Sequence, residues 1–396
     1  MPSSFSQNLN TLAEIIIRVG LNLQRGQRLL IAEPYELQGV SRDAAGLVEA
    51  VTACAREAGA RDIEVIWGDE QQYRRDAERG DIRRFEQLVS GHTDRMTEYV
   101  DRGDALLFLQ SGQPELLAGV PAGRVTELHN LAWTHFGSVA QRLTRSATNW
   151  TAAPAPTPGW ADAVYPDLPV NDRLPLLWSA IFEACRLSSA DPLTAWQRHL
   201  EALRQQRDNL NSRRRASLHF SGDGTDITLA LPLGHRWCTA CLTSQAGVPF
   251  VANLPTEEVF TLPHMDSAEG RVRAARSVAY GGALIDGVEL EFRGGRVIRA
   301  RARVGEALLH QILQTDAGAM RLGEVAVVAP GNSIARSGRL FHLPLLDENA
   351  GNHIALGNAY AFTLRDGTGM TARQFAAAGG NQSRVHVDLP ITADLV

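Results

Sequence analysis

347-DENAGNHIALGNAY-360 and 383-SRVHVD-388 are the two stretches that organise this sequence. They supply two histidines, a tyrosine and several carboxylates near the C-terminal end. His386 and Asp388 are two positions apart, and side chains two positions apart in a β-strand point to the same face. One short strand can therefore present an imidazole nitrogen and a carboxylate oxygen together, and these atoms bind Zn²⁺ and similar divalent ions. An isolated His-x-Asp pair is also common without a metal, so the rest of the chain has to decide.

The composition is that of an ordinary soluble globular protein. The chain has 396 residues, 44% hydrophobic and 21% charged, and this length favours two domains. The formal net charge of −5 argues against a nucleic-acid partner and an anionic membrane surface, because both call for basic patches. All 39 basic residues are arginine. The lack of lysine excludes a Walker-type nucleotide loop, a Schiff base with pyridoxal phosphate and a kinase site.

The cysteines and the N-terminal segment favour a reducing, cytoplasmic setting. Cys238 and Cys241 form a Cys-x-x-Cys motif, but it lies in a strand-rich region, whereas a redox motif usually opens a helix. No second such motif completes a zinc knuckle. The N-terminal segment lacks the pattern of a signal peptide, because Arg18 interrupts its apolar run, and no stretch is long and apolar enough to span a membrane. We therefore expect a cytoplasmic protein.

The first part of the chain alternates between strand and helix patterns. The predicted strands are 28–34, 62–67 and 105–112, and the predicted helices are 6–20, 42–58, 69–89 and 123–144. This alternation predicts a parallel sheet with helices on both faces, which we assign to an N-terminal α/β domain of residues 1–160. No Gly-x-Gly-x-x-Gly sequence follows any of these strands, so nucleotide binding is unsupported.

The second part has the pattern of a mainly antiparallel β domain. Residues 149–168 are rich in proline and alanine, but their two tryptophans favour an ordered, packed crossing over a linker. The elements expected after this segment are helices over 173–187, 192–213 and 304–316 and a hairpin over 288–303 that turns at Gly294-Gly295. All candidate ligands fall within this part. We therefore assign residues 161–396 to a C-terminal α+β domain that binds metal.

Further candidate ligands lie upstream in the same domain. His353 lies in a polar, glycine-flanked segment that we expect to be a loop, and Glu324 opens an apolar strand over 325–330. Glu257 and Glu258 add two more carboxylates. A single zinc ion needs only three protein ligands, whereas five or six nitrogen and oxygen ligands suit two metal ions that share bridging groups. Such a pair activates a water, polarises a carbonyl and can receive a free amine, as hydrolysis of an N-terminal peptide bond requires.

Four blocks of sequence carry a family resemblance. They are NLPTEEVFT, RLGEVA, LFHLPLLDENAGNHIALGNAY and NQSRVHVD, in this order along the chain. On these blocks, nearly the whole chain resembles the thermophilic aminopeptidase family of the aminopeptidase T, AmpS and PepS type, which are dinuclear metallopeptidases. The site residues that the resemblance implies are the metal ligands Glu258, Glu324, His353, His386 and Asp388 and the catalytic Tyr360.

The resemblance also implies how such a protein works. It implies an aminopeptidase of broad specificity that prefers apolar or leucine side chains. A water would be activated between two divalent ions of zinc, cobalt or manganese. The protein would act on peptides as a cytoplasmic homodimer with an enclosed active-site cavity.

The general base is open between two carboxylates. Glu257 adjoins a predicted ligand and could accept a proton from the water. If residues 257–258 are extended, however, neighbouring side chains face opposite sides, and Glu324 would serve as both bridge and base. Asp347 and Glu348 could bind the ammonium group of a substrate, although we expect them to serve in capping and turns.

Two other functions compete with the peptidase. A mononuclear Fe(II) ring-opening dioxygenase would use His353, His386 and Asp388 as its metal-binding face. Glu258 and Glu324 argue against it, because one iron does not need them. The other alternative is a non-catalytic binding protein, which the complete set of ligand blocks disfavours.

Overall fold

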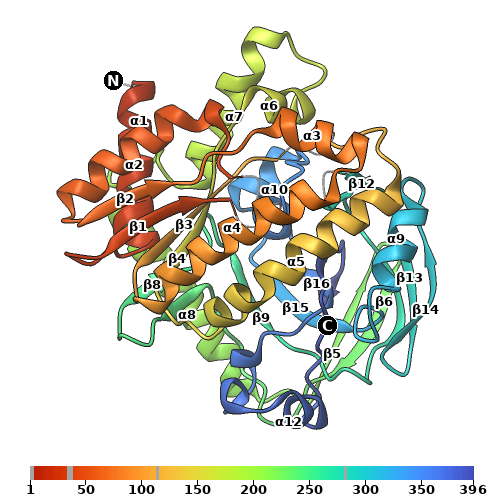
Figure 1. Ribbon diagram of the computed structural model, residues 1–396. Helices are drawn as coiled ribbons and strands as arrows, with labels where there is room; N and C mark the ends of the chain where they lie inside the picture. The colour runs from red at the N-terminus through yellow and green to blue at the C-terminus, as the bar shows by residue number, and fades with distance from the viewer. Residues whose placement is uncertain (1–3, 34–38, 113–115, 281–282) are drawn as a thin grey trace. The chain divides into compact units, whose positions relative to one another are not determined.

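The computed structural model describes residues 4–33, 39–112, 116–280 and 283–396 (Figure 1). The chain forms two compact units, each made of segments that are separate in sequence. The first unit comprises Met1–Val120, Glu127–Glu201 and Ala240–Thr256, and the second comprises Pro121–Thr126, Ala202–Thr239 and Glu257–Val396. The domain boundary expected between residues 160 and 161 remains a prediction.

A four-stranded parallel sheet forms the centre of the first unit, as the alternating pattern predicts. Its strands, in spatial order, are β2 (Asp62–Val65), β1 (Arg28–Ala32), β3 (Ala105–Gln110) and β4 (Trp150–Pro154). Every residue of β1 and β3 is buried, as expected of inner strands in a parallel sheet that helices cover. Of the strand expected over 28–34, Pro34 lies outside the described residues.

Helices precede and follow these strands along the chain (Figure 1). They are α1 (Phe5–Ile15), α2 (Ala45–Glu57), α3 (Glu70–Arg79), α4 (Ile82–Asp101), α5 (Ala122–Thr144), α6 (Pro158–Val164), α7 (Val170–Ala184) and α8 (Pro192–Arg213). The single helix expected over 69–89 is two helices. Gly80 ends α3 with a φ of 75°, and the side chain of Asp81 then accepts a hydrogen bond from the N–H of Arg84 at the start of α4.

The segment 149–168 contains a strand that the sequence did not predict. Trp150–Pro154 forms β4, which pairs in parallel with β3. Thr157 then caps α6 by accepting a hydrogen bond from the N–H of Trp160, whose side chain is fully buried. The expectation of an ordered, packed segment is confirmed. The strand was missed because five residues that include alanines and a proline show no strand periodicity.

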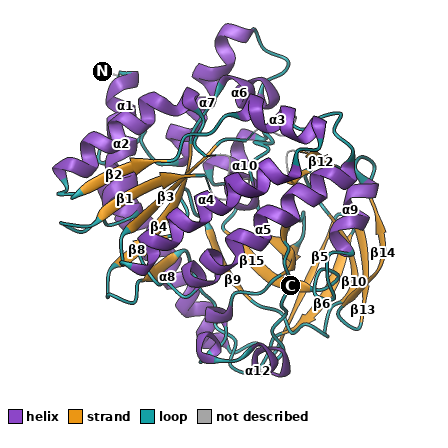
Figure 2. Ribbon diagram, viewed as in Figure 1, coloured by secondary structure: helices purple, strands orange, loops and turns teal. Residues whose placement is uncertain are grey.

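The second unit is built mainly from antiparallel strands, as predicted. A six-stranded sheet has the spatial order β14 (Arg296–Arg301), β13 (Glu289–Arg293), β10 (Glu269–Arg273), β6 (Thr225–Ala230), β5 (Ser217–Gly222) and β18 (Asp394–Leu395). The predicted hairpin is β13–β14, and its turn residues Gly294 and Gly295 have φ angles of 54° and 74°, which suit a tight hairpin turn. α9 (Glu306–Leu313) lies beside β14 (Figure 2).

The remaining elements are short, apart from a second four-stranded sheet described with the site. They are the pair β11 (Val278–Tyr280) and β12 (Ala283–Ile285), the helices α10 (Ser333–Ser337), α11 (Pro344–Asp347) and α12 (Ala372–Ala377), and, in the first unit, the pair β7 (Cys241–Thr243) and β8 (Pro249–Val251). Within the described ranges, no helix has both the length and the hydropathy of a membrane span.

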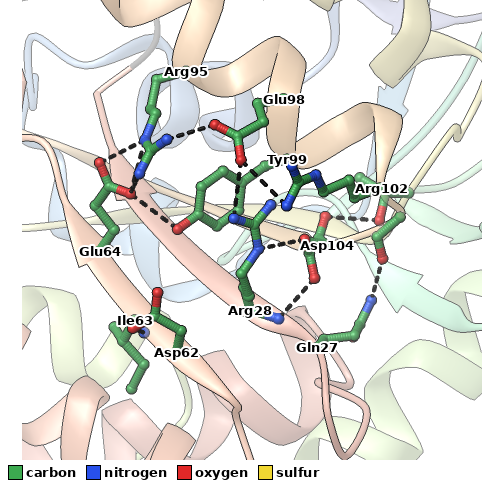
Figure 3. A network of polar contacts seen from close by, with 12 residues as sticks. Gln27, Arg28, Asp62, Ile63, Glu64, Arg95, Glu98, Tyr99, Arg102 and Asp104 are labelled. Carbon is green, nitrogen blue, oxygen red and sulfur yellow. Dashed lines mark hydrogen bonds and ion pairs between the residues drawn. The ribbon is translucent and has the colours of Figure 1, made fainter.

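A buried ion-pair network in the first unit ties the start of β1 to α4 and β3 (Figure 3). The Nε of Arg28 donates to Oδ2 of Asp104 over 2.7 Å, and the two side chains are only 9% and 8% exposed. Arg28 also pairs with Glu98 at 3.1 Å and lies over the ring of Tyr99. A buried charge pair of this kind depends on both partners, because either charge alone would be left without compensation.

We predict that Arg28→Met lowers the free energy of unfolding by about 3–5 kcal/mol, because Asp104 loses its buried cation. Arg18→Met is the matched control in the same unit, since Arg18 and Glu14 are 63% and 37% exposed and a surface pair contributes at most about 1 kcal/mol. Denaturant titration followed by circular dichroism measures both changes. Equal losses of stability in the two variants would contradict the prediction.

Candidate metal centre

The second four-stranded sheet bears apolar side chains on one face and the candidate metal ligands on the other. Its strands, in spatial order, are β17 (His386–Pro390), β16 (His353–Gly357), β15 (Leu322–Val328) and β9 (Glu258–Thr261). Directly paired residues share a face, and successive residues alternate. One face packs into the hydrophobic core through Val259, Val325, Ile354, Leu356, Val387 and Leu389. The opposite face bears Glu258, Glu324, His353, His386 and Asp388.

A β-bulge in β15 turns Glu324 toward this ligand face. Leu322 pairs with Leu356 of the core face, whereas Glu324 pairs with Ala355 of the ligand face, so the register shifts by one residue between them. Without the bulge, Leu322 and Glu324 would point to the same side. Gly323 is the extra residue, and a Cβ there would lie 2.2 Å from the carbonyl oxygen of Asn358. Glycine is therefore required for this close approach of the two strands.

His353 is the first residue of β16, which corrects the expected loop. Its side chain is fully buried. Ala355, two residues later, pairs with Glu324 on one side and with Asp388 on the other. A methyl group at this central position leaves the space among the ligand side chains open, whereas a larger residue would fill it.

The first cluster of ligand atoms comprises Glu258, Glu324 and His353, which approach one another within 4.8 Å. The Nε2 of His353 lies 3.1 Å from Oε2 of Glu258 and 3.6 Å from Oε1 of Glu324. Both the Nε2 of His353 and the Oε2 of Glu258 are buried without a hydrogen bond. Converging, unsatisfied nitrogen and oxygen atoms fit a metal ion, which would satisfy both.

The second cluster comprises Glu324, His386 and Asp388, again within 4.8 Å of one another. The Nε2 of His386 lies 4.0 Å from Oε2 of Glu324 and 3.4 Å from Oδ1 of Asp388. Glu324 therefore belongs to both clusters and directs a different oxygen to each histidine. The sequence interpretation of His386 and Asp388 as a pair on one strand face agrees with this geometry.

Backbone carbonyls fix the orientation of both histidines. The Nδ1 of His386 lies 2.8 Å from the carbonyl oxygen of Asn358, and the Nδ1 of His353 lies 3.3 Å from that of Gly351. An imidazole that donates from Nδ1 leaves the lone pair of Nε2 available as a metal ligand. Both Nε2 atoms face the carboxylates.

The site concentrates negative charge in a buried place. Burial would lower the pKa of His386, but Asp388 and Glu324 outweigh it and raise the pKa to about 9. Burial likewise opposes the charge of His353, yet Glu258 and Glu324 raise its pKa well above the usual range. Each histidine is thus held in a field that attracts cations.

Glu348, for which we expect a role in turns, also interacts electrostatically with this charge cluster. It begins the short 3₁₀ turn Glu348–Ala350. Burial raises its pKa well above the ordinary value, and the charges of Glu258 and Asp388 raise it further. The sequence Asp347-Glu348-Asn349 is typical of turns, so we did not predict that Glu348 interacts with the site. Its place in the same sequence block as His353 could have indicated this interaction.

Asp347 makes local hydrogen bonds to the preceding turn, as its sequence context predicts. Its Oδ1 accepts from the N–H of Phe341 over 2.8 Å, and its Oδ2 accepts from the N–H of Leu343 over 3.1 Å. Burial raises the pKa of Asp347 to about 7.

Glu257 precedes β9 and belongs to neither cluster of ligand atoms. Its side chain is buried. Its backbone N–H donates to Oδ1 of Asn349 over 2.6 Å, and Nδ2 of Asn349 donates to the carbonyl oxygen of Leu345. Asn349 thus joins the backbone before Glu258 to α11, the helix that ends directly before Glu348.

Tyr360 lies beside the second cluster. Its ring centroid is 5.0 Å from that of His386. Its backbone carbonyl accepts hydrogen bonds from both the N–H and the hydroxyl of Thr363. The predicted catalytic tyrosine and the predicted ligands therefore share one site within the second unit.

The comparisons with known proteins match nearly the whole length of this chain. The family model of the thermophilic metalloproteases (M29) matches residues 5–395. Aminopeptidase T of Thermus aquaticus is 39% identical over 401 residues, which cover 99% of this chain and 94% of that protein. Aminopeptidase AmpS of Bacillus subtilis (strain 168) is 36% identical over 388 residues, which cover 98% of this chain and 93% of that protein.

A solved structure supports the same assignment. The wild-type AmpT structure from Thermus thermophilus superposes with a TM-score of 0.88 and 36% identity, over 99% of this chain and 98% of that chain. This similarity agrees with the combination of a parallel α/β part and an antiparallel β part. The chain therefore belongs to the M29 family of thermophilic metalloproteases, and it is a hydrolase that acts on peptide bonds.

Proposed function

We propose that this chain is an aminopeptidase that removes the N-terminal residue of peptides with the help of two divalent metal ions. Broad specificity with an apolar or leucine preference is part of the proposal, as is zinc, cobalt or manganese as the metal. The observation that supports two ions best is the place of Glu324 in both ligand clusters, with one carboxylate oxygen toward each histidine. The cytoplasmic location and the homodimer remain predictions.

The donor set and its charge fit two divalent ions. Glu258 and His353 would hold one ion, His386 and Asp388 would hold the other, and Glu324 would bridge them. The charges of Glu258, Glu324, Glu348 and Asp388 interact in this buried place, and two divalent cations would balance the four carboxylates. When bound, such ions polarise a carbonyl and lower the pKa of a water molecule.

Tyr360 and one acidic residue would complete the chemistry. The hydroxyl of Tyr360 would donate a hydrogen bond to the oxygen that becomes negatively charged when water attacks the scissile carbonyl. Glu348 would accept the proton of the attacking water, because its carboxylate lies in the field of the same charges as the ligands. Glu257, which is buried next to Glu258, and Glu324 remain the other candidate bases.

The dioxygenase alternative has less support. One Fe(II) would use His353, His386 and Asp388 and would leave Glu258 and Glu324 as buried carboxylates without a cation. Such uncompensated charges are costly inside a protein. The family assignment to metalloproteases also favours hydrolysis.

Hydrolysis of leucine p-nitroanilide tests the function directly. We predict that a chelator lowers the rate to background, because the ligand side chains alone cannot polarise the carbonyl. Dialysis against zinc, cobalt or manganese should then restore the rate. Full activity in the chelated protein, or none with any divalent metal, would refute the proposal.

The metal content of a series of variants tests whether Glu324 bridges the two ions. We predict that Glu324→Gln loses both ions, whereas Glu258→Gln and Asp388→Asn each lose one, because only Glu324 serves both clusters. Elemental analysis after dialysis counts the ions, and Glu289→Gln, on an exposed position of β13, is the matched control that should keep two. Retention of both ions by Glu324→Gln would contradict a bridging role.

A matched pair of variants distinguishes the candidate bases. We predict that Glu348→Gln lowers kcat about 10²-fold or more while both ions remain bound, and that Glu257→Gln lowers kcat less than tenfold. Steady-state kinetics and metal content of the two proteins provide the measurements. The reverse order of the two losses would assign the base to Glu257.

A further inference from the structure

Tyr360 is enclosed by other rings. Its ring stacks on that of Phe362, with centroids 5.4 Å apart and an interplanar angle of 14°. Phe260 meets both rings edge-on, at 6.1 Å from Tyr360 and 6.0 Å from Phe362. His386 contacts the ring of Tyr360 from a further direction, at 5.0 Å. A ring contacted from three directions has little freedom to rotate about its side-chain bonds.

The rings are attached to the ligand framework. Phe260 is two residues after Glu258 on β9, so both side chains are on the ligand face. Phe362 lies in the 3₁₀ turn Ala361–Thr363, directly after Tyr360. The backbone N–H of Arg236 donates to the carbonyl oxygen of Thr363 over 2.7 Å and fixes the end of this turn.

The burial of Phe362 differs from that of an ordinary core residue. Its side chain is only half-buried, and it is not a member of the hydrophobic core that lies against the opposite face of the sheet. Its stacked contact with Tyr360 is therefore a better account of its position than burial of apolar area. A planar ring at this position restricts where the hydroxyl of Tyr360 can lie.

We propose that Phe362 is a positioning residue that acts through Tyr360: its stacked ring holds the hydroxyl of Tyr360 in the orientation that the reaction needs. The inference rests on the proposed function, in which this hydroxyl stabilises the developing negative charge. Preorganised donors act without reorientation during the reaction. A displacement of about 1 Å caused by a residue outside the reacting groups can cost about 10²-fold in rate.

A double-mutant cycle on leucine p-nitroanilide tests the coupling between the two residues. We expect Tyr360→Phe to lower kcat about 10²-fold and Phe362→Leu to lower it about tenfold, with KM within about twofold of the parent. In the Tyr360→Phe background, Phe362→Leu should change kcat by less than about twofold, because no hydroxyl is left to position. Phe362→Tyr keeps a planar ring and should retain at least half of the parental kcat.

Controls separate positioning from stability and from metal binding. Phe292→Leu replaces a buried ring of β13 and should affect thermal unfolding but not kcat. Phe362→Met is the second variant in case Phe362→Leu does not fold, since it fills space without a planar ring. Metal content should stay at the parental value in all three Phe362 variants.

The outcomes distinguish the inference from the proposed function. An unchanged kcat in Tyr360→Phe would refute the catalytic role of Tyr360 itself. An equal loss of kcat caused by Phe362→Leu in the parent and in the Tyr360→Phe variant would refute only the positioning role. Two further results would also overturn the positioning role: loss of bound metal in Phe362→Leu, which would mean action through His386, and a rise in KM confined to large apolar substrates, which would mean direct contact with the substrate.

Discussion

The sharing of Glu324 between two ligand clusters is the interaction on which the rest of the site depends. One buried carboxylate directs its two oxygens to two histidines, while Glu258 and Asp388 approach from the flanking strands. Carboxylates at such distances repel one another, and burial removes the water that would screen them. The raised pKa values of Glu324 and Glu348 express this cost. Bound cations would relieve this repulsion.

The two faces of the sheet hold these carboxylates close together. Each strand gives every second residue to the hydrophobic core and the others to the ligand face, so the core holds the ligands in register. The bulge at Gly323 is needed because Leu322 belongs to one face and Glu324 to the other. Ala355 keeps the centre of the ligand face open between Glu324 and Asp388. The stability of the second unit and the geometry of its site are therefore set by the same strand pairing.

Residues outside the strands lie next to the candidate site. Asn349 links the backbone before Glu258 to the turn that begins at Glu348. Tyr360 follows β16 and is held by neighbouring rings and by the hydrogen bonds of Thr363. These groups are borne by short turns, which are free to place an acid or a hydroxyl where a strand with fixed alternation cannot. The rigid sheet supplies the proposed metal ligands, and the turns supply the groups that we propose to act on the substrate.

The sequence alone determined the features that depend on local pattern. Alternating strands and helices indicated the parallel part, turn residues indicated the hairpin β13–β14, and period-two spacing placed His386 and Asp388 on one face. Family resemblance then implied a set of metal ligands, which remains a prediction. Only the tertiary structure decided that Glu324 faces the site, that His353 begins a strand, that residues 150–154 join the parallel sheet and that the charge of Glu348 interacts with those of Glu258 and Asp388. Those features depend on a bulge, on strand pairing and on charge contacts between residues far apart in sequence, and no local pattern encodes them.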